Sequence, residues 1–139
     1  EVLEKINKYA NKNNYKIYSI AGNYINKNSI IPSPIEFLKL IKNAKVVFTD
    51  SFHAVAFSII MQTKFVVFNR KDVKQFSRLE TLFNKYDLTS VIYDESMPLN
   101  IIIEKCIFDE KIKIKLQKEQ MNGKKYLEAI IANAIKKGD

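Results

Sequence analysis

Short apolar runs alternate with segments of helical length along most of the chain, and this alternation limits the folds that it can adopt. The clearest example lies at residues 45–69. There the apolar run KVVFTD is followed by the largely apolar segment SFHAVAFSIIMQ and then by a second apolar run, FVVFN. Strands that alternate with helices at such spacings form right-handed βαβ units and a parallel sheet. We therefore expect an α/β fold.

The segments before this region extend the pattern. Apolar residues recur at helical spacing in residues 1–13, and the β-prone run at 15–20 is typical of a strand. Residues 22–31 are polar and predict a loop. Ser33 and Glu36 then stand at capping-box spacing, which predicts the start of a helix ending near residue 43.

The second half of the chain adds further elements. We predict a loop over 70–78, a helix over 79–86 and a strand over 91–94, followed by helices over 100–139 with a break at Gly123. The expected architecture is a three-layer, Rossmann-like domain with a parallel sheet of about four strands and a helical C-terminal extension.

Length and composition are those of one globular domain. The chain has 139 residues, of which 47% are hydrophobic and 27% charged, and no apolar run reaches the roughly 20 residues of a membrane span. Its one cysteine, Cys106, cannot form an internal disulfide, so a reducing compartment is expected. We expect a cytoplasmic protein, with peripheral association at the inner face of the membrane left open. The chain starts at Glu1 within an expected helix, which favours a fragment of a longer protein.

The basic charge does not by itself indicate nucleic-acid binding. Lysine and arginine total 23 against 15 acidic residues, a formal net charge of +8. Only Arg70 and Arg78 are arginines, although bidentate recognition of bases and phosphates favours arginine. The lysines are dispersed, which is typical of a solvated surface. No specific nucleic-acid partner is expected, and a basic, non-catalytic binding module remains an alternative.

One turn concentrates the polar side chains that could carry chemistry. Thr49, Asp50 and Ser51 follow an expected strand, and His53, the only histidine, falls in the first turn of the next helix. Ligands of open α/β sheets bind beyond the carboxyl ends of strands. Asp50 or Ser51 can cap this helix, and its N-terminus favours an anion. His53 could transfer a proton or pair with an anion, or it could be a partly buried core residue.

Arg70 and Arg78 form a second candidate group. Both follow the apolar run at 65–69, and arginine suits a carboxylate or a phosphate. A surface salt bridge of Arg78 with Asp72 or Glu80 is the competing interpretation. The chain has no glycine-rich phosphate loop and no GxSxG motif, and one Cys with one His cannot form a Cys/His zinc site. No metal site or cofactor is expected.

The segment SPIEFLKLIKNAKVVFTDSFHAVAFSIIMQTKFVVF resembles the polysaccharide pyruvyl transferase family. The most specific part is the TDSFH sequence at Thr49-Asp50-Ser51-Phe52-His53, and a weaker element surrounds Arg78. The resemblance implies a two-domain, GT-B-like transferase with its active site in the cleft. This chain then corresponds to the C-terminal half, without the N-terminal domain, and is expected to be inactive alone.

The resemblance also implies a reaction. Family members transfer a pyruvyl group from phosphoenolpyruvate to a sugar of a cell-surface polysaccharide or its lipid-linked precursor. It implies that His53 is a donor-site or acid/base residue and that Arg78 contacts an anion. Some members have Arg-Leu-His where this chain has Ser51-Phe52-His53. Arg78 or Lys64 could replace that missing arginine. A nucleotide-sugar glycosyltransferase and a family member without catalysis remain alternatives.

Overall fold

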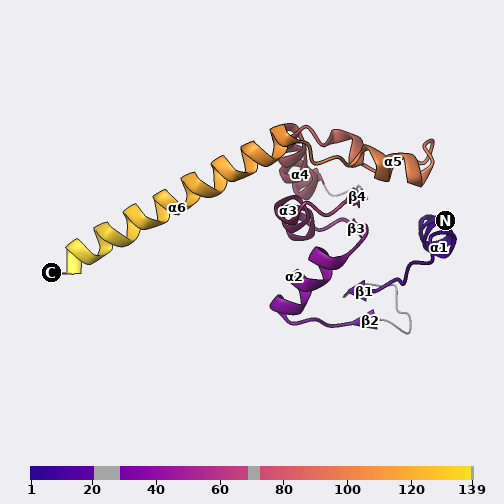
Figure 1. Cartoon of the computed structure of the whole chain (residues 1–139), viewed down its shortest axis with the longest axis horizontal. Coiled ribbons are helices and arrows are strands. Elements are labelled where there is room, and N and C mark those ends of the chain that lie inside the picture. The colour runs from indigo at the N-terminus through magenta and orange to yellow at the C-terminus, as the bar shows by residue number, and fades with distance from the viewer. Residues whose placement is uncertain (21–28, 69–72, 139) are drawn as a thin grey trace. The chain divides into compact units, whose positions relative to one another are not determined.

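A computed structural model describes residues 1–20, 29–68 and 73–138, which divide between two compact units, Glu1–Ile107 and Phe108–Asp139. The second unit contains the long helix α6 (Glu110–Gly138). The first contains, in chain order, α1 (Val2–Lys12), β1 (Ser19–Ile20), β2 (Ser29–Ile30), α2 (Pro34–Asn43), β3 (Val47–Thr49), α3 (Phe52–Met61), β4 (Phe65–Val67), α4 (Val73–Tyr86), the 3₁₀ turn η1 (Thr89–Val91) and α5 (Leu99–Lys105) (Figure 1).

The described strands form two separate parallel pairs. Strand β1 pairs with β2, and β3 pairs with β4 in the register Thr49 opposite Val67. Strand β2 lies within the segment for which the sequence predicts only a loop. The chain is thus a mixed α/β protein with short parallel sheets. The structure does not show the expected single sheet of about four strands or a Rossmann-like arrangement.

The run at 91–94 explains part of this difference. It begins inside η1 and then joins β4 only through one parallel bridge, between Val67 and Ile92. The carboxylate of Asp94 accepts hydrogen bonds from the backbone N–H and the hydroxyl of Ser96, at 2.9 and 2.7 Å. This local turn bends the chain after Tyr93, so the predicted strand cannot continue.

The capping box of α2 is confirmed. The Glu36 N–H donates to Ser33 Oγ at 3.3 Å, and the Ser33 N–H donates to Glu36 Oε2 at 2.8 Å. These two bonds satisfy donors that have no acceptor within the helix. They fix the residue at which α2 begins. Helix α2 is followed by β3, the strand that leads into the candidate site.

Two predicted boundaries are wrong. Helix α4 begins at Val73, not near residue 79, because the half-buried Phe76 extends the helical stripe of Leu79 and Phe83 by one turn towards its N-terminus. Helix α6 passes Gly123 without a break. A Cβ at Gly123 would meet no atom within 4 Å. This open position carries only the propensity cost of glycine, about 1 kcal/mol relative to alanine, which long flanking helical segments tolerate.

Helices pack on both faces of the β3–β4 pair. Because successive strand residues point to opposite faces, Phe65 and Val66 enter different parts of the core. The Phe65 ring stacks on Phe83 of α4, with ring centroids 6.4 Å apart. On the other face, Val66 joins a buried cluster from α1 and α5, formed with Ile6, Leu99, Ile102 and Ile103.

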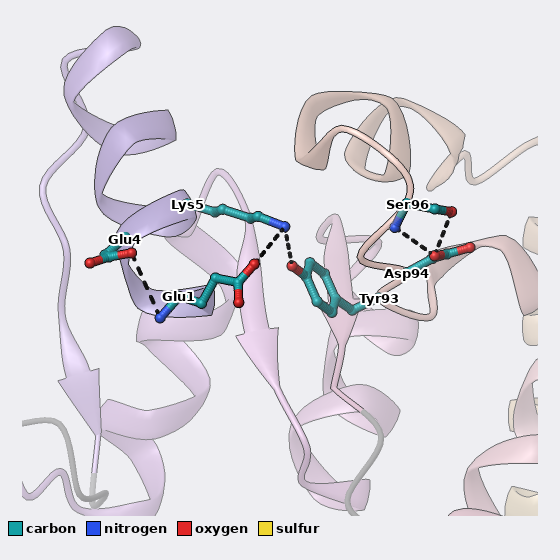
Figure 2. Close-up of polar contacts among 6 residues, drawn as sticks. All are labelled: Glu1, Glu4, Lys5, Tyr93, Asp94 and Ser96. Atoms are coloured by element: carbon teal, nitrogen blue, oxygen red, sulfur yellow. Dashed lines mark hydrogen bonds and ion pairs between the residues drawn. The ribbon is translucent and has the colours of Figure 1, made fainter.

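Helix α1 is held at the carboxyl end of the β4 segment. Lys5 Nζ donates to the hydroxyl of Tyr93 at 3.0 Å and lies 3.8 Å from a carboxylate oxygen of Glu1 (Figure 2). The pKa of Lys5 is raised, mainly by this hydrogen bond to Tyr93. The Tyr93 ring packs against Phe68, centroid to centroid 5.1 Å, and Phe68 stacks on Phe48. An aromatic row therefore lies under α1 at this end of the sheet.

Candidate active site

The turn at residues 49–53 links the end of β3 to the start of α3. Thr49 is the last residue of β3, Ser51 is the N-cap residue, and Phe52 begins the helix. The Ser51 N–H donates to Thr49 Oγ1 at 3.0 Å, and this side-chain bond closes the turn. Thr49 and Asp50 are half-buried, whereas Ser51 and His53 are exposed. Four of the six predicted site residues therefore meet in one turn at the carboxyl end of a parallel strand.

The start of α3 is suited to an anion. Ser51 makes no capping hydrogen bond through its side chain, and no acidic residue lies in the first turn. The N–H of Val55 donates to the Ser51 carbonyl at 3.1 Å, so the N–H groups of Phe52, His53 and Ala54 precede this first helical bond. These groups and the positive end of the helix dipole favour a negatively charged ligand.

His53 faces solvent and is not a core residue. Its ring lies edge-on to Phe52, with centroids 6.0 Å apart, and the side chain is exposed. The next two residues, Ala54 and Val55, are 5% and 0% exposed and form the buried face of α3. The interpretation of His53 as a partly buried core histidine is therefore wrong, and the imidazole is accessible to a ligand at this helix end.

The two arginines are not placed in the 49–53 turn with the other candidate residues. Arg78 is exposed in the second turn of α4, and no described residue, Glu80 included, is its ion-pair partner. Arg70 lies outside the described residues, as does Asp72. Within the ranges that the structure describes, no hydrogen bond or ion pair joins Arg78 to the 49–53 turn. The role of each arginine stays a prediction.

Lys64 lies at the wrong end of the sheet to replace the missing arginine. It precedes β4, and its carbonyl accepts from the Val47 N–H at the first residue of β3. Thr49 and His53 lie at the opposite, carboxyl end. The positive charge of Lys64 instead lies near Cys106 and favours the thiolate form of that cysteine. Burial outweighs this effect and raises the pKa of the fully buried Cys106 thiol, so this cysteine is not a candidate nucleophile.

Sequence reasoning missed a second group of residues at the carboxyl edge. A cavity of about 490 Å³ lies beside the chain that follows η1. Hydrogen bonds from Ser96 lower the pKa of Asp94 and keep it ionised (Figure 2). The positive charge of Lys105 lowers this pKa by a smaller amount. The signal was present, because Asp94 and Ser96 directly follow a predicted strand. The cavity is lined by Thr89, Ser90, Ile92, Tyr93, Asp94, Glu95, Met97 and Lys105.

Neither group has the ligands of a metal centre. Over residues 1–20, 29–68 and 73–138, no three His, Cys, Asp or Glu side chains are placed together to hold a metal ion. The chemistry available to the described part of the site is proton transfer by an imidazole and hydrogen bonding by hydroxyl, carboxylate and backbone N–H groups.

Comparison with known proteins supplies one match. The sequence model of the family described as polysaccharide pyruvyl transferase matches residues 2–72, which is 71 of the 139 residues. The matched span includes the whole 49–53 turn and ends before Arg78. No curated protein and no solved structure gives a significant match.

Proposed function

The chain belongs to the polysaccharide pyruvyl transferase family, and we propose that it carries the donor-site half of an enzyme that moves a pyruvyl group from phosphoenolpyruvate to a sugar. The observation that carries this proposal is the exposed imidazole of His53 in the first turn of α3, inside the matched span. We infer that the other half of the cleft comes from sequence outside these 139 residues.

The charge of the donor suits this helix end. Phosphoenolpyruvate has a phosphate and a carboxylate, and either anion can accept from the first-turn N–H groups of α3. Thr49 Oγ1 accepts from Ser51, which leaves the hydroxyl proton of Thr49 available to a ligand oxygen. The exposed Ser51 hydroxyl adds a second donor. Arg78 and Arg70 are the arginines that we propose for the remaining anionic group.

The reaction requires a proton donor. Forming a ketal makes two C–O bonds from sugar hydroxyls to the central carbon of the donor and breaks its bond to the phosphate oxygen. The two hydroxyls lose their protons: the methylene carbon gains one and becomes a methyl group, and the phosphate leaves with the other. His53 is proposed as the general acid or base, because an imidazole exchanges protons near neutral pH. Asp50 is proposed to orient the donor or the acceptor from the same turn.

A replacement of His53 tests the proposal. We expect His53→Gln and His53→Ala to lower acceptor-dependent phosphate release from phosphoenolpyruvate by two to four orders of magnitude, roughly the range of general acid–base catalysis. The assay uses the longest natural form of the protein with a panel of free and lipid-linked saccharides. Lys42→Ala is the control, because Lys42 is exposed in the last turn of α2, at the amino end of β3.

The outcomes separate the candidate functions. Unchanged phosphate release in both His53 variants, with normal thermal stability, would remove His53 from the mechanism. Turnover of nucleotide sugars without turnover of phosphoenolpyruvate would favour the glycosyltransferase alternative. Binding of polyanions that weakens steeply with salt, without turnover of either donor, would favour a basic binding module.

A further inference from the structure

The C-terminal part of α6 exposes large apolar side chains over several turns. From residue 117 to residue 136 every side chain is exposed. Among these are apolar side chains that a stable globular surface normally covers. They are Met121, Tyr126, Leu127, Ile130, Ile131 and Ile135, with exposed fractions of 46–68%.

From Tyr126 onwards these side chains form a continuous face and are not scattered. Leu127, Ile130, Ile131 and Ala134 follow the spacing i, i+3, i+4 and i+7, which is one side of a helix. At about 100° per residue, the apolar face from Tyr126 round to Ile135 covers about half of the helix circumference. Near the start of α6, Ile112 and Leu116 lie on this same side of the helix, and both are buried. The apolar face (residues 126–135) thus continues a buried stripe into solvent.

Charge identifies the kind of partner that fits. Residues 110–138 contain eight lysines and three glutamates. Lys124 and Lys125 precede the apolar face, Lys136 follows it, and Glu128 is the acidic residue between them. Because this excess of lysine leaves the segment strongly basic, a second copy of α6 would add like charge. The partner that complements this helix is therefore anionic as well as apolar.

We propose that the apolar face of α6 lies on an anionic lipid surface. A coiled-coil seam is a narrow stripe, whereas an apolar face of half the circumference suits a flat boundary. Lysines on the polar side of such a helix, as Lys125 and Lys136 are here, strengthen its attraction to anionic headgroups, and Tyr126 at the edge of the face suits the interfacial depth. No helix among the described residues is long and apolar enough to cross a bilayer. The proposal concerns α6 alone and does not rest on pyruvyl transfer.

Vesicle co-sedimentation of the 139-residue chain tests this proposal. The probes are vesicles of phosphatidylcholine alone and vesicles with 30% phosphatidylglycerol. We expect binding to the anionic vesicles with a gain of helical circular dichroism, because lipid contact stabilises the exposed turns. The variant Leu127→Gln/Ile131→Gln is expected to bind at least tenfold more weakly. The matched control Ala129→Gln/Ala132→Gln also introduces two glutamines, but on the opposite side of the exposed helix. This control is expected to bind like the wild type.

Charge variants and the oligomeric state complete the test. Lys124→Gln/Lys125→Gln should weaken binding to anionic vesicles by roughly 30-fold, about fivefold per lysine. Equal binding to neutral vesicles, no binding to either kind, or equal loss in the alanine-site control would each overturn the proposal. A dimer in light scattering without vesicles, broken by Leu127→Gln/Ile131→Gln, would assign the face to a second copy instead.

Discussion

Truncation of Phe83 is the sharpest test of how the first unit is held together. The Phe83 side chain is 0% exposed and stacks on Phe65 of β4, itself 0% exposed. The backbone N–H of Phe65 also donates to the sulfur of Cys106 at 3.4 Å. Phe83 and the chain's one cysteine are therefore joined through Phe65, the first residue of β4.

The expected loss follows from burial and from the aromatic pair. A Phe→Ala change at a fully buried site costs about 3–5 kcal/mol, which includes the lost transfer free energy and the cavity. The stacked pair accounts for about 0.5–1.5 kcal/mol of such a loss. Since small domains are stable by about 5–15 kcal/mol, the Phe83→Ala variant should remain folded, but its first unit should open transiently far more often.

Cys106 supplies the assay. Burial raises its thiol pKa and blocks access, so a thiol reagent reacts only when the first unit opens. At about 1.4 kcal/mol per tenfold change, the labelling rate of Phe83→Ala should rise by a factor of about 10² to 10³ or more. This readout follows the first unit, whereas far-UV circular dichroism is dominated by helices, α6 among them.

A matched control makes the result decisive. Ile35 lies in α2 and is 67% exposed, so Ile35→Ala should change the labelling rate by no more than about twofold. A rise of less than tenfold in Phe83→Ala would refute the reasoning. It would mean that Cys106 is exposed by a local opening in which the Phe65–Phe83 contact stays intact.

Two smaller predictions concern hydrogen bonds. Thr63→Val should destabilise the chain by about 1–3 kcal/mol in urea unfolding, because the buried Thr63 hydroxyl donates to the Ile41 carbonyl at 3.0 Å; an unchanged midpoint would contradict this. Ser33→Ala should cost about 1 kcal/mol through loss of the cap. Hydrogen bonds from Ser33 lower the pKa of Glu36 below its ordinary 4.5. The advantage of the wild type over Glu36→Gln should therefore be complete above pH 4.5 and disappear as pH falls through the lowered pKa, which thermal unfolding against pH measures.

Local signals in the sequence were sufficient for much of the site. Ser33 and Glu36 predicted the start of α2 because a capping box is formed by residues three apart. The apolar runs around residues 45–69 predicted β3, α3 and β4, and this order placed Thr49, Asp50, Ser51 and His53 at the carboxyl end of a strand. The family could also be predicted, because its most specific residues lie within one short segment.

Other features depended on contacts between distant residues. The single bridge at Ile92, in place of a full strand, depends on the turn made by Asp94 and Ser96 and on pairing with Val67. The early start of α4 depends on the core that receives Phe76. Whether His53 was buried or exposed could not be predicted either, because its helix is apolar on nearly all sides.

The sequence by itself determined the α/β character of the chain, its helix start at Ser33 and the family to which it belongs, because each is encoded by neighbouring residues. Only the tertiary structure decided that His53 faces solvent, that Lys64 lies at the far end of the sheet and that Asp94 joins the carboxyl edge. Those facts depend on strand pairing and helix packing between segments far apart in the chain, and no local pattern records them.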